Sequence, residues 1–321
     1  MNILVVRTDK LGDFITALPT MYVLKAYNPQ NRIIACVAPL NLDLAKSCDF
    51  IDEVIVDDSK CSILSLAQEI KMHNIDASIT LFSNTRVAFA QFLAKIPKRI
   101  APATKLAQIF YTKRVKQRRS EVKMAEFEYN LALTTELFSD ISLEYKKPLF
   151  EFEDRENIYK AFCENNKINK KVMAFHIGFG GSSDANWTPA EYEVLIRAVL
   201  KENRYQIVLT FGPDEKDLFE EMQSRLSDEN VVFYLSVDGL LFFAKLVASF
   251  KLFVSTSTGT YHIASSVGCP TMTFFGDSLF ASASRWKSIG EKEKQVHYML
   301  PQDSIKRSEV FKDVKEKLIL F

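Results

Sequence analysis

Short apolar runs alternate with helical patterns along the whole chain, and this alternation constrains the fold most. In the N-terminal half we expect strands at Asn2–Val6, Arg32–Ala38, Glu53–Val56, Ala77–Leu81 and Lys98–Ile100, with helices near Phe14–Tyr27, Ile63–His73, Thr85–Lys95 and Met124–Phe138. In the C-terminal half we expect strands at Val172–Ile177, Gln206–Thr210, Val231–Phe233, Leu252–Ser255 and Thr271–Phe275. Strand–helix alternation of this kind favours parallel sheets covered on both faces, so the predicted fold class is α/β and doubly wound.

The length of 321 residues suits two domains of roughly 150 residues each. The stretch Leu143–Asp154, with Pro148 and mixed charge, is the predicted linker, which gives domains at residues 1–147 and 148–321. Ligands of doubly wound domains bind at the carboxyl ends of the strands, here in an expected cleft between the two domains. A final helix, Ser308–Leu320, carries apolar residues at helical spacing and should pack back on its domain.

Composition narrows the class of protein. The five cysteines are scattered, with no C-x-x-C pair and no metal-ligand spacing, which is typical of reduced thiols in a cytosolic protein. The chain begins directly on strand-like residues without a signal peptide, and no run of 18 apolar residues suggests a membrane span. We therefore expect a cytoplasmic protein that uses no metal and no cofactor.

The segment Val254–Gly276 is the most informative for function. It is predicted to form a buried strand, a hydroxyl-rich turn, a short helix and a second buried strand. The first turn of the short helix carries Ser257, Thr258 and Gly259. Such a helix start offers unpaired backbone N–H groups and the positive end of the helix dipole to a phosphate. The alternative is that Ser257 or Thr258 simply caps the helix.

A second strand–turn–helix unit follows the expected strand Val172–Ile177. Its turn, Gly178-Phe-Gly-Gly-Ser-Ser183, is rich in glycine and can approach a diphosphate closely. Thr188, Pro189 and Glu191 form a capping box with proline at the first helical position, so a helix is predicted to begin there. Two such turns in one half of the chain indicate a nucleotide-diphosphate ligand.

Charge is distributed unevenly, although the formal net charge is only +1. Between Asp76 and Glu121 the sequence has no acidic residue, and that window holds ten cations: Arg86, Lys95, Lys98, Arg99, Lys105, Lys113, Arg114, Lys116, Arg118 and Arg119. Such a stretch attracts phosphate, carboxylate or an anionic membrane surface. A nucleic-acid site, for which no motif is present, and a merely solvated face are the alternatives.

One carboxylate is a candidate catalytic base. Asp13 follows the first expected strand, near the start of a helix, and would therefore lie at the carboxyl edge of the sheet. A carboxylate there could accept the proton of an attacking hydroxyl, a role worth about 10²–10⁴-fold in rate. The competing interpretation makes Asp13 only the N-cap of the helix, worth about 1 kcal/mol.

These residues together resemble the glycosyltransferase family 9 heptosyltransferases, nearly end to end. The resemblance rests on the order and spacing of the following motifs: Arg7-Thr-Asp-Lys-Leu-Gly-Asp13, His176-Ile-Gly-Phe-Gly-Gly181, Trp187 before Pro189, Phe211-Gly-Pro-Asp-Glu215, Ser257-Thr-Gly-Thr-Tyr-His262, and Phe275-Gly276 followed by Arg285-Trp286.

The resemblance implies a GT-B fold, in which an N-terminal acceptor-side domain and a C-terminal nucleotide-sugar-binding domain, both Rossmann-like, face a cleft. It also implies metal-independent, inverting transfer, usually of heptose from ADP-heptose to the lipopolysaccharide or lipooligosaccharide inner core. Asp13 would be the general base. The donor site would comprise Gly180, Gly181, Glu215, Ser257, Thr258, Gly259 and His262, although His262 is equally well a structural histidine.

The resemblance also gives the basic window a role. Inner-core acceptors carry carboxylates and phosphates and lie at the cytoplasmic leaflet, so Arg86, Arg114, Arg118 and Arg119 are predicted to bind the acceptor. The protein would then be peripheral on the inner face of the inner membrane, and no nucleic acid would be a partner.

Two departures from the family pattern affect the donor. Members commonly have Asp where this chain has Ser257, and Lys where it has Ala185. A different nucleotide-sugar donor is therefore one alternative, and a catalytically silent nucleotide-sugar-binding scaffold is another. The retained Asp13 and the two phosphate turns favour an enzyme.

Overall fold

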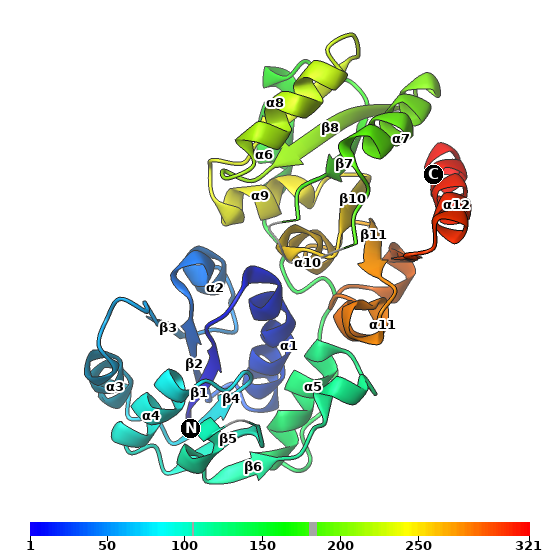
Figure 1. The fold of residues 1–321 in the computed structure, drawn as a ribbon. Coiled ribbons are helices and arrows are strands. Elements are labelled where there is room, and N and C mark those ends of the chain that lie inside the picture. Colours follow the sequence, from blue (N-terminus) through cyan, green and yellow to red (C-terminus); the bar gives the residue numbers. More distant parts are fainter. Residues whose placement is uncertain (105, 180–184) are drawn as a thin grey trace. The chain divides into compact units, whose positions relative to one another are not determined.

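The computed structural model describes residues 1–104, 106–179 and 185–321 (Figure 1). The chain divides into two compact units, Met1–Lys146 and Lys147–Phe321. Each unit contains one six-stranded sheet in which every pairing is parallel. The expected α/β class is therefore confirmed.

The N-terminal sheet has the strand order β3-β2-β1-β4-β5-β6. Its unit contains β1 (Asn2–Arg7), α1 (Leu11–Tyr27), β2 (Arg32–Val37), η1 (Pro39–Asn41), α2 (Leu42–Lys46), β3 (Glu53–Val56), α3 (Ile63–Met72), β4 (Ala77–Thr80), α4 (Thr85–Leu93), β5 (Lys98–Pro102), η2 (Leu106–Phe110), β6 (Lys113–Val115), η3 (Arg119–Glu121), α5 (Glu126–Ala132) and η4 (Leu133–Glu136).

The C-terminal sheet has the order β12-β11-β10-β7-β8-β9, which is the same topology. Its unit contains α6 (Arg155–Asn165), β7 (Lys171–His176), α7 (Pro189–Lys201), β8 (Tyr205–Phe211), α8 (Lys216–Arg225), β9 (Val231–Leu235), α9 (Leu240–Val247), β10 (Leu252–Thr256), α10 (Gly259–Ser266), β11 (Thr271–Gly276), η5 (Leu279–Ala281), α11 (Ala283–Trp286), η6 (Lys292–Lys294), β12 (Gln295–Leu300) and α12 (Ser304–Leu320).

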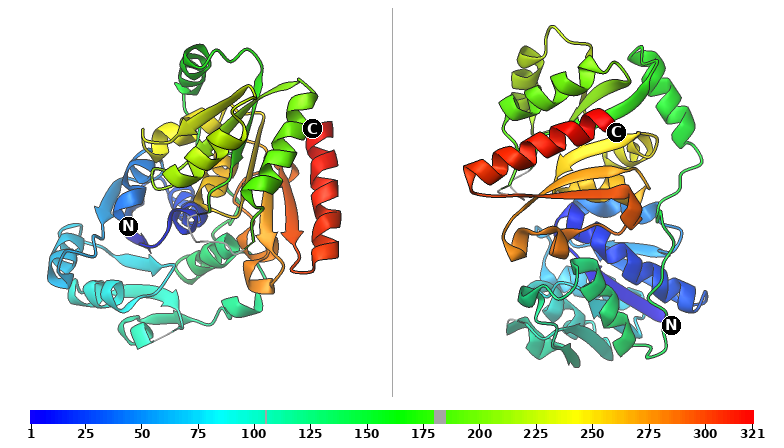
Figure 2. Two further views of the ribbon diagram at one scale, coloured as in Figure 1. Left: turned by 45° about the horizontal axis from the view of Figure 1, so that its top comes forward. Right: turned by 90° about the vertical axis from the view of Figure 1, so that its right-hand side faces the viewer.

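Burial explains why the central strands are apolar throughout. Residues 3–7 of β1 and all of β10 are buried, because helices cover both faces of each sheet (Figure 2). The predicted capping box at the start of α7 is confirmed, with Thr188 and Glu191 bonded reciprocally. The final helix is also confirmed: Val314 and Leu318 of α12 join the core of the C-terminal unit, although α12 begins four residues earlier than predicted, at Ser304.

Within the described residues, no helix is long and apolar enough to cross a bilayer.

Candidate active site

Both sheets reverse their winding direction beside the first strand of the unit. In the N-terminal sheet β1 lies between β2 and β4, and in the C-terminal sheet β7 lies between β8 and β10. The loops that follow β1 and β4, or β7 and β10, therefore diverge and leave a crevice at the carboxyl edge. Most of the predicted site residues follow one of these four strands.

In the N-terminal unit, the last residue of β1 organises the crevice. The Arg7 side chain is only 2% exposed, and its guanidinium binds three carboxylates. Its Nε lies 2.8 Å from Asp9, its Nη1 lies 3.3 Å from Glu126, and its Nη2 donates to Asp13. Asp13 is thereby oriented by a buried cation and remains 18% exposed.

The position of Asp13 excludes one of the two sequence-based interpretations. Helix α1 begins at Leu11 with Lys10 as its N-cap, so Asp13 lies inside the first turn. The interpretation of Asp13 as an N-cap is therefore wrong, although a carboxylate in the first turn still complements the helix dipole.

The cluster continues away from the crevice through α5. Arg119 donates to Glu126, and the Nδ2 of Asn130 donates to the Thr16 carbonyl on α1 at 3.2 Å. Arg119, predicted to bind an acceptor, is thus linked to Arg7 through Glu126. Sequence reasoning missed Glu126 because 119 residues separate it from Arg7, whereas the position of Arg7 at the end of a strand was a usable signal.

Burial shifts the proton equilibria of this cluster. Burial alone would lower the pKa of Arg7, but Asp9, Asp13 and Glu126 raise it above its ordinary value. Burial raises the pKa of Asp9 to about 6 from 3.8, with Asp13 adding to the shift and Arg7 opposing it. Asp9 therefore binds its proton more tightly in the folded protein than in the unfolded chain.

This shift predicts a pH-dependent stability difference for Asp9→Asn. Between pH 3.8 and about 6 the native state keeps a proton that the unfolded chain has lost, so wild-type stability falls as pH rises through that window. The Asn variant lacks this loss. The difference in free energy of unfolding, variant minus wild type, should therefore rise by on the order of 2 kcal/mol between about pH 4 and about pH 7.

Urea unfolding at the two pH values measures this gain, with Asp214→Asn at an exposed position as the control. A gain in the control of the same size, or none in Asp9→Asn, would contradict the assignment.

A polar hollow of about 450 Å³ lies at the same edge of the N-terminal sheet. It is lined by Thr8, Ala38, Pro39, Asp57, Asp58, Ser59, Asn84, Thr85 and Arg86, which follow β1, β2, β3 and β4. The guanidinium of Arg86 is held in its wall, with Nε 2.8 Å from Asp57 and Nη2 3.0 Å from the Asp58 carbonyl. Sequence reasoning missed both aspartates.

The four predicted acceptor cations do not form one group. Arg86 lines the hollow, whereas Arg119 belongs to the Arg7 cluster. Arg118 is 75% exposed and lies 3.2 Å from Glu121, and Arg114 is an exposed residue of the edge strand β6. Arg114 and Arg118 are therefore the two most accessible to a large anionic ligand.

In the C-terminal unit, the N-terminus of α10 lies directly after β10. Thr258 occupies the N-cap position but its side chain makes no capping hydrogen bond, and its Oγ1 lies 2.8 Å from the Thr260 hydroxyl instead. The helix leaves its first N–H groups, starting at Gly259, without intrahelical acceptors. The interpretation of Ser257 or Thr258 as a simple side-chain cap is therefore wrong, and an anion could bind these donors.

Hydrogen bonds fix the described residues on both sides of the glycine-rich segment that follows β7. The Nδ2 of Asn186 donates to the Ile177 carbonyl at 2.7 Å, and the Thr256 hydroxyl donates to the Ala185 carbonyl at 2.7 Å. The second bond connects Ala185 to Thr256, the last residue of β10. Gly180 and Gly181, the predicted phosphate-binding residues, lie outside the described residues.

Glu215 packs against the start of the glycine turn. Its Oε2 accepts the Gly212 N–H at 2.7 Å and lies 3.9 Å from the Nε2 of His176, whose pKa is lowered by burial and raised in part by Glu215. A Cβ on Gly178 would lie 1.8 Å from Oε1 of Glu215. The absence of a side chain at Gly178 therefore leaves the space that this carboxylate occupies.

This contact predicts that alanine at Gly178 weakens nucleotide binding, whereas alanine at Gly212 does not. Gly178→Ala must displace the Glu215 carboxylate, whereas a Cβ on Gly212 would meet Glu215 at an ordinary 3.5 Å. Because the displaced group is a flexible side-chain end, Gly178→Ala should keep the wild-type melting temperature and bind nucleoside diphosphate about tenfold more weakly. Gly212→Ala is the matched control, and equal binding of both variants in calorimetry would contradict a donor-site role for Glu215.

His262 lies inside α10, 3% exposed, with Nδ1 3.2 Å from the Ser288 hydroxyl. Burial lowers the pKa of His262 to about 3, so the ring is neutral at physiological pH. It can offer a phosphate a hydrogen bond but no positive charge.

The two departures from the family pattern differ in their surroundings. Ala185 is 3% exposed within the core of the C-terminal unit, beside Ile177 and Trp187. Ser257 is half-buried, and its N–H donates to the Phe274 carbonyl at 2.9 Å. Neither side chain brings a charge to the end of β10.

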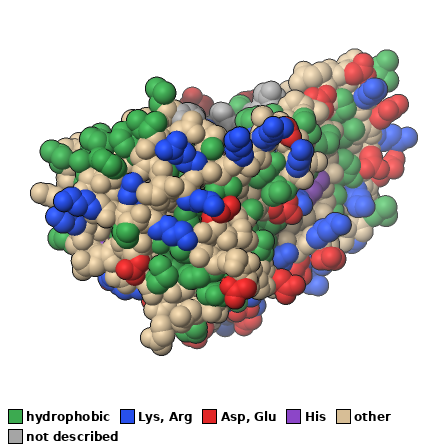
Figure 3. Space-filling view, turned by 90° about the horizontal axis from the view of Figure 1, so that it is seen from below, with side chains coloured by type: hydrophobic (Ala, Val, Ile, Leu, Met, Phe, Trp, Pro, Cys, Tyr) green, Lys and Arg blue, Asp and Glu red, His purple; other side chains and the backbone are tan. Residues whose placement is uncertain are grey.

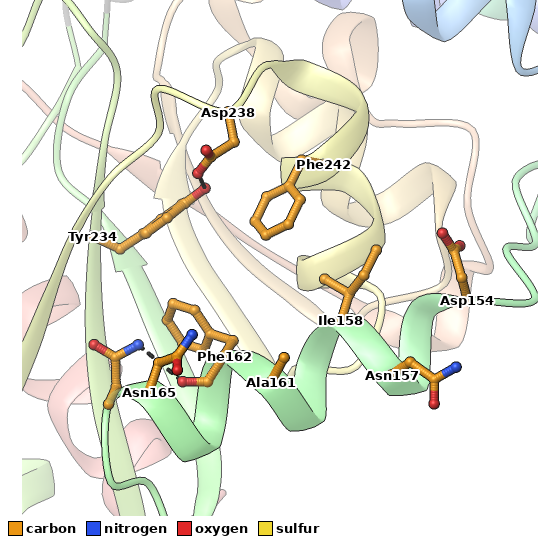
Figure 4. Close-up of a pocket in the computed structure, with 10 residues that line it drawn as sticks. Asp154, Asn157, Ile158, Ala161, Phe162, Asn165, Tyr234, Asp238 and Phe242 are labelled. Carbon is orange, nitrogen blue, oxygen red and sulfur yellow. Dashed lines mark hydrogen bonds between the residues drawn. The ribbon is translucent and has the colours of Figure 1, made fainter.

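A larger hollow of about 520 Å³ lies elsewhere in the C-terminal unit, between α6, β9 and α9 (Figure 4). Ile158, Phe162 and Phe242 form an apolar wall, and the carboxylates of Asp154 and Asp238 lie at its rim. An apolar wall with carboxylates does not suit a diphosphate. The strand-end crevice remains the candidate site.

Comparison with known proteins identifies the family. The family model for glycosyltransferase family 9 (heptosyltransferase) matches residues 63–315, a range that begins after Asp13. A Haemophilus influenzae protein provisionally named a glycosyltransferase is 37% identical over 311 residues, covering 94% of this chain and 89% of its own. Lipooligosaccharide heptosyltransferase 2 of Campylobacter jejuni is 22% identical over 333 residues, covering 100% of this chain and 96% of its own.

The structure of the E. coli ADP-heptose LPS heptosyltransferase II superposes with a TM-score of 0.80 at 18% identity, covering 100% of this chain and 99% of its own. This match shows the GT-B fold with two Rossmann-like domains. The chain belongs to glycosyltransferase family 9, the heptosyltransferase family, and is a glycosyltransferase.

Proposed function

We propose that this glycosyltransferase moves heptose from ADP-heptose onto the inner core of lipopolysaccharide or lipooligosaccharide, by an inverting and metal-independent mechanism. The observation that carries the proposal is the uncapped N-terminus of α10 at the β7–β10 crevice, in a chain of the heptosyltransferase family. The named C. jejuni and E. coli relatives support heptose as the sugar and ADP as the nucleotide.

In the proposed reaction Asp13 is the general base. Its carboxylate takes the proton of the acceptor hydroxyl while that oxygen attacks the anomeric carbon from the side opposite the nucleotide. The bond from the anomeric carbon to the phosphate oxygen breaks, and the diphosphate leaves with the electron pair. One displacement inverts the configuration, and Arg7 holds Asp13 in place throughout.

The C-terminal unit is proposed to bind the donor. Backbone N–H groups at Gly259, beside Thr258, would stabilise the negative charge that builds on the departing phosphate. Glu215 would meet the ribose, and neutral His262 would supply at most a hydrogen bond. Gly180, Gly181 and Ser257 are the remaining proposed donor contacts.

A second candidate function keeps the reaction and changes the donor. Ser257 and the core residue Ala185 leave the end of β10 without the carboxylate and the cation that family members commonly carry there. A UDP- or GDP-hexose donor is the alternative that these positions favour. A silent nucleotide-sugar-binding scaffold is the third, and the Arg7–Asp13 contact argues against it.

The N-terminal unit is proposed to bind the acceptor. Carboxylate, amide and hydroxyl groups in the polar hollow suit sugar hydroxyls, and Arg86 is already engaged by Asp57 there. Exposed Arg114 and Arg118 would contact acceptor carboxylates or phosphates, and Arg119, which is bonded to Glu126, is the remaining proposed acceptor residue. An acceptor of this kind would place the enzyme at the cytoplasmic face of the inner membrane as a peripheral protein.

The acceptor assignment predicts a selective kinetic effect. Replacing Arg114 and Arg118 together by Ala should raise the acceptor KM about tenfold or more, while nucleotide affinity and kcat stay unchanged. Lys160→Ala, a 77% exposed cation in the other unit, is the control. An unchanged acceptor KM in the double variant would remove these residues from the acceptor site.

The proposed function is tested by transfer itself. The purified chain is incubated with ADP-heptose and a heptose-deficient lipooligosaccharide, with and without a chelator. The mass of the acceptor is then measured by mass spectrometry. We expect one added heptose at the same rate in both samples. Transfer only from UDP- or GDP-hexose would establish the second candidate, and transfer that the chelator abolishes would overturn the metal-independent mechanism.

A further inference from the structure

Large apolar side chains are exposed around η2 in the N-terminal unit. Leu106 is 84% exposed, Ile109 is 64% exposed and Phe92, at the end of α4, is 48% exposed. In a 3₁₀-helix, residues three apart lie above one another, so Leu106 and Ile109 share one side of η2. The folded unit therefore presents them together to the solvent.

The other side of η2 fixes this arrangement. Ala107 is buried in a cluster with Ala88, Ala101 and Tyr111, against which Phe110 packs. The Phe110 ring lies 5.6 Å from the Phe92 ring. Because η2 is anchored on α4 and β5 by these residues, the outward positions of Leu106 and Ile109 are held by the fold.

Cations lie on the strands and the helix end that flank these apolar groups. Lys98 and Arg99 begin β5, Lys113 begins β6, and Lys95 is an exposed residue just after α4. The Arg99 guanidinium lies 5.7 Å from the centre of the Phe92 ring, and its Nε donates to the Phe110 carbonyl at 2.7 Å. The cations thus belong to the same part of the surface as the exposed rings.

This stretch of the sequence is poor in acidic residues, although Asp76 directly precedes Ala77, which pairs with Lys98. The sequence has none between Asp76 and Glu121, and the carboxylate paired with a cation of the group is Glu136, 2.9 Å from Lys113. Figure 3 shows the underside of the molecule, where hydrophobic and Lys or Arg side chains lie side by side. Exposed apolar groups beside positive charge complement an anionic interface.

Two lysines of this surface, Lys98 and Lys113, lie at the opposite edge of the sheet from Asp13. Lys98 and Lys113 are the first residues of parallel strands, whereas Asp13 follows the carboxyl end of β1. We call Phe92, Leu106, Ile109, Lys95, Lys98, Arg99 and Lys113 the basic–apolar face. It is distinct from the polar hollow, whose residues follow the carboxyl ends of the strands.

We propose that the basic–apolar face docks on an anionic lipid bilayer. Leu106 and Ile109 enter the boundary between headgroups and acyl chains, and the lysines contact the lipid phosphates. Aromatic rings beside cations, like Phe92 with Arg99, are typical of groups placed at that boundary. The proposal specifies the membrane contact of the proposed transferase, yet binding to lipid can be measured without any transfer.

Flotation of the full chain with vesicles tests the proposal. Vesicles of phosphatidylglycerol and phosphatidylcholine in roughly equal parts should bind the wild type, and pure phosphatidylcholine vesicles should bind about tenfold less. Leu106→Asp combined with Ile109→Asp should lower binding to the anionic vesicles about tenfold. Leu64→Asp, at a 66% exposed position on α3, should bind like the wild type.

A second variant isolates the charge. Lys95→Ala with Lys98→Ala should weaken binding severalfold at low salt, and wild-type binding should itself fall as the salt concentration rises to about 1 M. Equal loss in Leu64→Asp, equal binding to neutral vesicles, or full binding by the Leu106/Ile109 variant would each overturn the proposal. Transfer to a water-soluble acceptor should be unchanged in all these variants, so a loss of transfer alone would bear on the proposed function and not on the docking face.

Discussion

Replacing Asp13 by Asn should reduce sugar transfer by about 10²–10⁴-fold, because the amide cannot take the proton of the acceptor hydroxyl. Asn has nearly the shape of Asp and can still accept a hydrogen bond from Arg7, so the surrounding cluster should persist. Nucleotide affinity should stay within about twofold of the wild type, since the proposed donor contacts all lie in the other unit.

The measurement is kcat for transfer, with calorimetric titration of ADP on the same protein. Asp9→Asn is the control, because Asp9 also binds Arg7 but only Asp13 is proposed to accept the proton of the acceptor hydroxyl. Transfer should therefore persist in Asp9→Asn. Transfer that survives in Asp13→Asn would place the base elsewhere. Transfer that fails together with ADP binding would indicate a structural defect.

Replacing Arg7 by Met should destabilise the N-terminal unit by about 3 kcal/mol, because the half-buried Asp9 and Asp13 would lose their buried cation. Glu126 would retain Arg119. The loss should shrink at lower pH, since protonated carboxyls no longer need a positive partner. Thermal and urea unfolding at about pH 5 and about pH 8 measure both effects.

Arg118→Met is the matched control for this prediction. It removes the same guanidinium from a 75% exposed ion pair with Glu121, and should leave the melting temperature unchanged. A loss in Arg7→Met that is as small as the control, or one that grows as pH falls, would contradict the account of a buried cation organising the crevice.

The sequence predicts the central strands and the edge strands β3 and β9, but it misses the other edge strand of each sheet. The runs at β1 and β10 are apolar because both faces of these strands are buried. The edge strands β6 and β12 were missed, since exposed Lys113 and Arg114 begin β6 and most of β12 is half-buried. Polar edge strands have no strong period, and only their pairing with a neighbour forms them.

Helix α9 is another element that the sequence analysis does not predict. Helix α9, Leu240–Val247, is apolar except for Lys245, and periodicity alone does not distinguish such a short run from a strand. The boundary between the two units, at Lys146 and Lys147, falls within a stretch that composition marks only by Pro148 and mixed charge.

At the candidate site, the sequence-based predictions rest on local motifs and do not include the distant residues that contact them. Asp13 and Gly259 follow buried strands and could be recognised from their own neighbours. The approach of Glu215 to Gly178 joins two loops 37 residues apart, and Glu126 reaches Arg7 from α5. Contacts of this kind depend on strand order, which no local pattern contains.

The basic window likewise has more than one role in the structure. Arg86 is held by Asp57 and Arg119 by Glu126, so neither is a free surface cation. Arg114 and Arg118 remain exposed, and Lys95 and Lys98 lie on the basic–apolar face. A single acid-free stretch of sequence therefore contributes to the site cluster, the polar hollow and a separate surface.

The most direct test of the account is calorimetric titration of the purified chain with ADP, UDP and GDP, without added metal. The account predicts that ADP binds, and binds at least about tenfold more tightly than the other two. Preference for UDP or GDP would contradict the ADP-heptose assignment and favour a changed donor. No heat with any of the three would contradict a nucleotide-binding role for the end of β10 and the N-terminus of α10.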